Sequence, residues 1–539
     1  MAWCDGAAIA MRTAATGRPL LQHAHAGAAP EQVKRTGQAD HTTTKDYNIA
    51  TGSIHPTIVA ILSDWYLRTD KERRRLDSRN HDIVPTMPMR LSKCLFCTTV
   101  LLALPSVHAQ APAPETSVPT TDQVIKHFGA APNGLARYDY LNEVIPRLDK
   151  DDAAFARQLL ATVDSELGLY DEALMTFPFD NRINPSRSAM LPQRGAWATV
   201  SAADAVVDMA ANRHIVMVNE AHHDAHTREL TLELLPRLRA MGFQYFAAEA
   251  VDDKDPGLMQ RGYAIDTTGS EYLLEPLYGE IIRQAIKLGY IIVPYDADAS
   301  ASTARDTIEA QTLYEKVFAK DPQAKLFVHA GYSHIDKASG NLGSGIKPMG
   351  MQLAQMSGYD PLCVDQVQFR DVAVGGLDFG FYDKVALQFS PHEPIALRKL
   401  DSDTYWTSDR REHDITVILP PAAPSDLDYG VANVADAVRR EITLPQAPFD
   451  PRERPSWLSL EGKRTTVSID TTLCQDQVPC VVDAYYTGEP DNATPADRYT
   501  FLKGHSHNVL YLYPGHYRLR AWNAAGATLG QENIDVAMH

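Results

Sequence analysis

The feature that most restricts the fold is a regular alternation of short apolar runs and helix-like stretches between residues 213 and 370. The apolar runs are 214–218, 244–250, 290–298, 324–331 and 361–369. Such runs are typical of strands buried on both faces of a parallel sheet. The helix-like stretches are 227–241, 272–288, 303–320 and 349–356. Strands separated by helices require parallel pairing with right-handed crossovers, so we predict an α/β fold, a parallel sheet flanked by helices.

The rest of the chain divides around this α/β domain, which we place at 201–375. An Ala/Pro linker and a helical segment precede it within 110–200, with helices expected from Asp122 to about Phe179. Proline clusters predict an irregular extension over 376–462. Short alternating segments with turn residues then predict a small antiparallel β-sandwich over 463–539.

A secretory signal peptide is predicted at 89–109. Arg90 and Lys93 form its basic start, an apolar run covers 94–104, and small residues precede a cleavage site after Ala109. The run is about half the length that spans a bilayer, so we expect no transmembrane helix in the mature protein. The alternative, a buried core helix, lacks amphipathic surroundings. The prediction is a periplasmic or secreted protein.

The position of this signal suggests that translation starts at Met87 or Met89. Residues 1–88 show no sustained apolar periodicity, and we expect them to be a disordered upstream extension absent from the natural product. The net charge of the whole chain is -17. Nucleic-acid binding needs a concentrated surplus of Lys and Arg, so nucleic acid is not an expected partner.

The cysteine pattern fits an oxidising compartment. Three cysteines, Cys363, Cys474 and Cys480, lie beyond the predicted signal. We predict a disulfide between Cys474 and Cys480 across a short loop, and a buried free thiol at Cys363. The alternative, a two-cysteine metal clip, lacks ligands at suitable local spacing.

Ionisable residues gather where four of the predicted strands end. The residues are Glu220, His222, His223 and His226 after the first strand, with Arg228 opening the next helix, then Glu249, Asp296 with Asp298, and His334. Ligands of open parallel sheets bind outside the carboxyl ends of the strands. We therefore expect Glu220, His222, Glu249 and His334 to lie close together at one rim.

The chemistry of these residue types suggests proton transfer. A carboxylate, Glu220 or Glu249, beside His222 would suit the imidazole to accept a proton, with His334 as a second acid or base. Arg228 would hold an anionic group or stabilise an oxyanion. Structural alternatives exist for each of them. In these the carboxylates are loop or paired polar groups, His223, His226 and His329 are bystanders, and Asp296 or Asp298 caps a helix.

A family resemblance rests on the order of three motifs. They are "NEAHHDAHTREL…FAAEA", "YIIVPYDAD…ARDTIEAQ" and "KLFVHAGYSHI" followed by "GMQLAQMSGYD", over about 205–370. This order resembles the superfamily of erythromycin esterases, ChaN-like haem-binding proteins and TIKI/TraB-type metalloproteases. The resemblance maps the esterase site residues onto Glu220, His222, Arg228, Glu249, Arg305 with Asp306, and His334. It implies that His222 is the base that activates water.

The resemblance also implies alternatives. ChaN-like members bind haem near a similar Glu-x-His with a further histidine, here His226 or His223. Asn219 stands where the family usually has glycine, so the backbone at the strand end is expected to turn differently. The extension and the sandwich are not part of the family core.

Four functions remain in competition at this point. The first is a hydrolase of small-molecule esters, lactones or amides, with His223, His226, Asp296, Asp298 and Arg305 as substrate-binding residues. No G-x-S-x-G motif of a serine esterase is present. The others are a haem-binding protein, a Zn or Mn enzyme with Glu220, His222, Glu249 and His334 as ligands, and a scaffold without chemistry. The sequence sets no oligomeric state.

Overall fold

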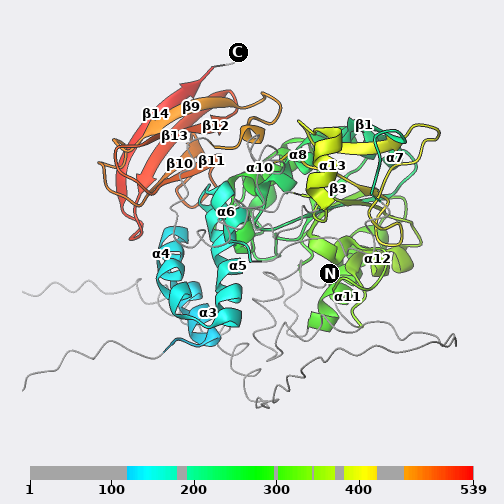
Figure 1. Cartoon of the computed structure of the whole chain (residues 1–539), viewed down its shortest axis with the longest axis horizontal. Helices are drawn as coiled ribbons and strands as arrows, with labels where there is room; N and C mark the ends of the chain where they lie inside the picture. The colour runs from blue at the N-terminus through cyan, green and yellow to red at the C-terminus, as the bar shows by residue number, and fades with distance from the viewer. Residues whose placement is uncertain are drawn as a thin grey trace, which may run out of the picture.

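A computed structural model describes residues 118–178, 191–296, 302–342, 345–370, 381–421 and 454–537. Within these residues the centre of the chain forms a six-stranded sheet in the order β4-β3-β5-β2-β6-β8, parallel throughout. The strands are β2 (Ile215–Glu220), β3 (Tyr245–Ala248), β4 (Ile291–Ile292), β5 (Leu326–Gly331), β6 (Leu362–Asp365) and β8 (Ile415–Thr416). The predicted α/β fold with a parallel sheet is confirmed (Figure 1).

Helices cover both faces of this sheet, and the side chains of β2 show how. Val216 and Val218 belong to one core with α7 (Ala202–Ala210), α8 (Glu229–Ala240) and α10 (Pro276–Lys287). Ile215 and Met217 belong to another core with α11 (Ser302–Leu313), the π-helical η7 (Tyr314–Phe318) and α12 (Met349–Ser357). Successive side chains of a strand point to opposite faces, so a strand covered on both sides is apolar throughout.

The observed elements differ from the predicted ones mainly at their ends. α8 begins at Glu229 after the 3₁₀ turn η5 (Ala225–Arg228), and α10 begins at Pro276 after η6 (Glu271–Leu274). β4 is much shorter than the apolar run 290–298 because Pro294 has no N–H to donate to a ladder.

The extension predicted at 376–462 is not irregular throughout its described part. It contains α13 (Phe381–Phe389) and β7 (Ile395–Lys399), and it supplies β8 to the edge of the main sheet beside β6. β7 pairs antiparallel with β1 (Trp197–Ser201). This part of the chain therefore completes the α/β domain.

The N-terminal segment is helical, as predicted. Its helices are α3 (Thr121–Ala130), α4 (Gly134–Val144), η3 (Ile145–Arg147), α5 (Lys150–Glu166) and α6 (Tyr170–Thr176). A capping box between Thr120 and Gln123 starts α3, and the Asp149 carboxylate caps α5. In Figure 1 these cyan helices lie below the orange and red strands and to the left of the green helices of the sheet domain.

Antiparallel sheets form the C-terminal part, as predicted. One sheet has the order β11-β10-β13-β14 and the other pairs β12 with β9. The strands are β9 (Thr465–Asp470), β10 (Cys480–Tyr486), β11 (Asp497–Phe501), β12 (His507–Leu512), β13 (Gly515–Trp522) and β14 (Thr528–Val536), preceded by η9 (Ser456–Ser459). Both sheets share one apolar core with α3, α4 and α5.

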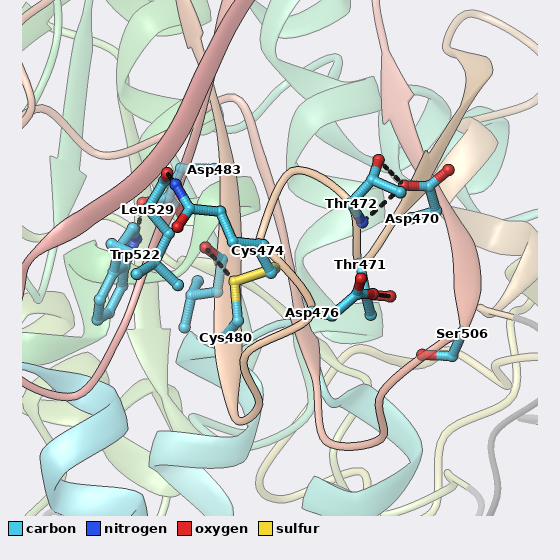
Figure 2. The surroundings of a disulfide bond; sticks show 12 residues. Asp470, Thr471, Thr472, Cys474, Asp476, Cys480, Asp483, Ser506, Trp522 and Leu529 are labelled. Carbon is cyan, nitrogen blue, oxygen red and sulfur yellow. Dashed lines mark hydrogen bonds between the residues drawn. A yellow bond between two sulfur atoms is a disulfide. The ribbon is translucent and has the colours of Figure 1, made fainter.

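The predicted disulfide is confirmed. Cys474 and Cys480 are joined at an S–S distance of 2.04 Å and close the loop that leads into β10 (Figure 2). In the same view Trp522 Nε1 donates to Asp483 Oδ2 at 2.7 Å, which ties β13 to β10. Cys363 is a buried free thiol, as predicted.

Ion pairs join the C-terminal sheets to the rest of the protein. Arg283 of α10 lies 2.7 Å from a carboxylate oxygen of Glu489, and Arg498 of β11 donates to the backbone oxygen of Glu166 at 3.1 Å. Among the helices that the structure describes, none is long and apolar enough to cross a bilayer. The predicted signal peptide and the residues before it lie outside the described part.

Candidate functional site

A carboxylate and an imidazole are paired at the end of β2. Glu220 is the last residue of the strand, and His222 Nδ1 donates to Glu220 Oε1 at 2.8 Å. Both side chains are 1% exposed. This bond fixes the tautomer in which Nε2 carries the lone pair. Within the residues that the structure describes, His222 Nε2 has no hydrogen-bond partner, so it is available to accept a proton.

Arg228 holds the carboxylate of this pair in its charged form. Its Nε donates to Glu220 Oε2 at 2.6 Å, its Nη1 to Glu275 Oε2 at 2.7 Å, and its Nη2 to the backbone oxygen of His222. Burial alone would raise the pKa of Glu220, but the Arg228 charge and the His222 bond outweigh it and hold the pKa well below its usual range. Because the guanidinium is committed to these partners, Arg228 positions the pair.

A second carboxylate, arginine and imidazole lie beside the first pair. Arg305 Nη2 donates to Glu249 Oε1, and Arg305 Nη1 lies 2.9 Å from His334 Nε2. The other imidazole nitrogen of His334 donates to Asp306 Oδ1 at 2.8 Å. Burial raises the pKa of Glu249, but the Arg305 charge outweighs it and keeps this carboxyl ionised.

Gly331, the last residue of β5, is where the two groups meet. Its N–H donates to Glu249 Oε2. A Cβ atom at this position would lie 2.6 Å from His222 Nε2 and 3.0 Å from Glu249 Oε2. The absence of a side chain at Gly331 therefore lets both groups approach the strand end. The four residues expected at one rim, Glu220, His222, Glu249 and His334, are brought together by the structure.

Glu309 adds an acidic group that sequence reasoning missed. Its Oε1 lies 2.7 Å from Arg305 Nε, four residues earlier on α11. Burial raises the pKa of Glu309 to about 8, which the Arg305 charge only partly offsets. The i, i+4 spacing of Arg305 and Glu309 was a signal for this pair. Glu275 was also missed, although a Glu before Pro276 indicates a helix start.

One group of ligand atoms is compact enough for a metal ion. In the part of the chain that the structure describes, Asp306, Glu309 and His334 offer atoms within 4.8 Å of one another. Both nitrogens of His334 are already engaged, by Asp306 and by Arg305. Glu220 and Glu249, expected as ligands, are instead held by Arg228 and Arg305.

Asn219 connects the ends of three strands beneath the site. Its Nδ2 donates to the backbone oxygen of Tyr332 at 2.9 Å and to Asp365 Oδ1 at 3.0 Å, and its Oδ1 accepts from the Gln366 N–H at 2.8 Å. Tyr332 has a φ of 45°, a conformation that costs free energy for a residue with a side chain. Asn219 therefore lies within the regular strand β2, and its side chain holds the strained turn at Tyr332 that follows β5.

Aromatic rings enclose the imidazole of His222. Tyr272 is stacked on it with ring centroids 3.9 Å apart, and Tyr332 meets it edge-on at 5.0 Å. Such packing fixes the ring plane and lowers the local dielectric, which strengthens the bond to Glu220.

The remaining predicted residues lie around this centre. His223 Nδ1 lies 3.1 Å from the Tyr332 hydroxyl, and His226 pairs with Glu229 at 3.0 Å. Asp296 pairs with Arg305 at 3.1 Å, whereas Asp298 lies outside the described residues. His329, expected as a bystander, is buried and hydrogen-bonded to Thr231 at 3.0 Å.

A separate buried ion pair lies near β8, the edge strand of the main sheet. His413 Nε2 lies 2.7 Å from Asp336 Oδ1, and both side chains are 0% exposed. Burial alone lowers the pKa of His413, but Asp336, Asp365 and Glu412 outweigh it and raise the pKa to about 9. This imidazole is therefore charged at neutral pH.

Comparisons with known proteins give only weak similarities to solved structures. No family model and no curated protein matches the chain. Among solved structures, the type III effector HopBA1 is 13% identical with a TM-score of 0.27, covering 44% of this chain and 100% of the effector. The RRSP effector domain of a Vibrio vulnificus MARTX toxin is 15% identical with a TM-score of 0.24, covering 42% of this chain and 52% of that one. A structure described as bacterial protein toxins is 16% identical with a TM-score of 0.24.

The chain thus spans about half the length of the two toxin structures and the full length of the effector. At TM-scores this low the likeness does not bear on function.

Proposed function

We propose that the protein is a hydrolase in which His222 activates water for attack on an ester, lactone or amide carbonyl. The observation that carries the proposal is the buried Glu220–His222 pair, whose Nε2 has no hydrogen-bond partner among the described residues. An imidazole whose other nitrogen donates to a carboxylate is oriented and made more basic, which suits it to general-base catalysis.

In the proposed reaction for an ester, His222 Nε2 takes a proton from water while the water oxygen bonds to the carbonyl carbon. The tetrahedral intermediate then breaks its bond to the leaving oxygen, which receives the proton from the imidazolium. Ester and water become acid and alcohol, so atoms and charges balance. Glu220, kept ionised by Arg228, stabilises the imidazolium formed in the first step.

The second group supports the same chemistry in a different role. His334 is held by Asp306 and Arg305, and Arg305 also holds Glu249 beside His222. In the proposal, the Arg305 guanidinium supplies the positive charge near the carbonyl oxygen that becomes negative in the transition state, and His334, bonded to Asp306, holds the guanidinium in place. Export through a signal peptide at 89–109 remains part of the proposal and would place this hydrolysis in the periplasm or outside the cell.

The test is hydrolysis of p-nitrophenyl esters and of lactones by the wild type and by His222→Gln. A general base contributes about 10² to 10⁴ in rate, so we expect a loss of at least about 100-fold in kcat. The matched control is His214→Gln, since His214 precedes the same strand at its other end and bonds to the Ala324 backbone oxygen. A wild type no faster than the uncatalysed reaction, or equal rates for wild type and His222→Gln, would contradict the proposal.

A further inference from the structure

A narrow pocket lies next to the candidate active site, between α6, the turn after β2 and the segment that leads into η9. Its cavity volume is about 10 Å³, which is at the lower limit of the room that one water molecule needs. The residues that line it include Tyr170, Asp224, His226, Arg370 and Trp457. The pocket therefore admits no more than one water-sized group, such as a single oxygen of an acidic group.

Arg370 is the cationic group of this pocket, and two of its three guanidinium nitrogens have no hydrogen-bond partner among the described residues. Its side chain is 2% exposed, and Nη1 lies 3.4 Å from Asp224 Oδ2. Over the residues that the structure describes, Nε and Nη2 are buried and have no hydrogen-bond acceptor. Buried donors without a partner are costly, and an arginine in this state calls for an acceptor.

The two unused nitrogens form one edge of the guanidinium. Nε and Nη2 present parallel N–H bonds, the arrangement that matches the two oxygens of a carboxylate or phosphate. Asp224 occupies the opposite side through Nη1, and its other oxygen caps the N–H of His226 at 3.2 Å. Asp224 is thus committed to contacts that leave the bidentate edge open, and Asp171 is the second acidic residue of the wall.

His223 is a further buried donor close enough to Arg370 to be affected by its charge, although it does not line the pocket. Its Nδ1 faces the Tyr332 hydroxyl, and its Nε2 has no hydrogen-bond partner in the described residues. Burial and the nearby Arg370 charge lower the pKa of His223 well below its usual range, so the ring is neutral and adds no charge of its own. When the Tyr332 hydroxyl donates to Nδ1, the proton is on Nε2, and the ring is an N–H donor.

Aromatic rings form the rest of the wall. Trp457 is stacked on His226 at 4.7 Å and lies 5.4 Å from Tyr170. A wall of this kind keeps water away and strengthens charge-assisted hydrogen bonds. Asp224 lies two residues after His222, so the pocket and the catalytic pair share one turn.

We propose that the Nε–Nη2 edge of Arg370 is an anion-binding subsite that takes a carboxylate or phosphate group of the substrate. The claim that this anion is part of a hydrolysed substrate rests on the proposed function. The substrate class is then an ester or amide that carries an acidic group at one end.

The test compares an anionic ester with its neutral counterpart, 4-nitrophenyl hydrogen glutarate and methyl 4-nitrophenyl glutarate. The ratio of their kcat/KM values is measured for the wild type, Arg370→Gln and Arg370→Lys. We expect the ratio to favour the anionic ester in the wild type and to fall by about tenfold or more in Arg370→Gln, because charged hydrogen bonds are lost. Arg157→Gln, on the exposed side of α5, is the matched control.

A binding assay keeps the two proposals distinguishable. Calorimetric titration of the full chain with inorganic phosphate, and separately with acetate, should show binding that Arg370→Gln removes, and the two arms tell phosphate from carboxylate. If neither anion binds the wild type, or if both bind Arg370→Gln equally well, the subsite is refuted even when His222-dependent hydrolysis is present. If anions bind through Arg370 while no ester is hydrolysed, the subsite stands and the proposed hydrolase fails.

Discussion

Replacing Asn219 by alanine should destabilise the protein far more than the loss of one surface amide. The side chain is buried and makes three hydrogen bonds, to the Tyr332 backbone oxygen, to Asp365 and to the Gln366 N–H. Asp365 Oδ1 keeps its bond to the Val367 N–H after the substitution. The Tyr332 oxygen and the Gln366 N–H would lose the partner that Asn219 supplies.

The magnitude follows from those two groups. A buried polar group left without its partner costs about 1 to 3 kcal/mol, so two of them give a loss of about 4 kcal/mol in the free energy of unfolding. Asn219→Gly, which installs the residue expected from the family resemblance, removes the same three bonds and should cost at least as much. The strained turn at Tyr332 would be less firmly held, so His334 should be less well positioned and ester hydrolysis should fall as well.

The assay is urea-induced unfolding followed by far-UV circular dichroism. The control is Asn508→Ala, because Asn508 is buried in β12 and its Oδ1 accepts from the adjacent Val509 N–H at 2.8 Å. We expect that control to cost about 1 kcal/mol. If the losses for Asn219→Ala and Asn508→Ala agree within about 1 kcal/mol, Asn219 does not connect the three strands in the way described.

Two further predictions concern Gly331 and His413. In Gly331→Ala the new methyl group would overlap the imidazole of the candidate base, so kcat for ester hydrolysis should fall at least about 100-fold, whereas Gly129→Ala, with nothing within 4 Å, should not change it. Equal values of kcat in the two variants would show that the candidate base, His222, does not lie against Gly331. The pKa of His413 is raised from 6.5 to about 9. The contribution of its ion pair to the free energy of unfolding is therefore complete below pH about 6.5 and is lost as the pH rises through about 9. The loss is at most about 3 kcal/mol. Urea unfolding across this pH range should show that decline in the wild type and not in His413→Gln, and parallel curves would refute it.

The sheet could be predicted from sequence because each central strand is covered on both faces. The run Ile215–Val218 is apolar at every position, and the structure explains this by the two helix layers that its alternate residues meet. β8 has only two residues, Ile415 and Thr416, and no local pattern distinguishes so short a strand from a loop. Its place in the sheet is set by pairing with β6, which is a long-range contact.

The candidate site was predictable in its strand-end residues and only in part in their connections. Glu220, His222, Glu249 and His334 follow apolar runs, and the rule for parallel sheets brings such positions to one edge. The pairing of His222 with Glu220 was one of two predicted alternatives. The contacts of Arg228 were not predictable, because it lies between Glu220 and Glu275, residues far apart along the chain. The amide of Asn219 acts in the same way, through the ends of β5 and β6.

The contacts of Glu275 decide where this protein can be divided. Its carboxylate accepts from the Tyr170 hydroxyl of α6 at 2.8 Å, caps α10 through the Leu277 and Tyr278 N–H groups, and binds Arg228, which in turn holds Glu220. A fragment that begins after α6 would therefore carry both Glu220 and His222, the pair proposed to be catalytic, and yet lack one of the bonds that orient Glu275. Recombination between related genes would conserve this network of bonds only where the N-terminal helices and the sheet are inherited as one unit.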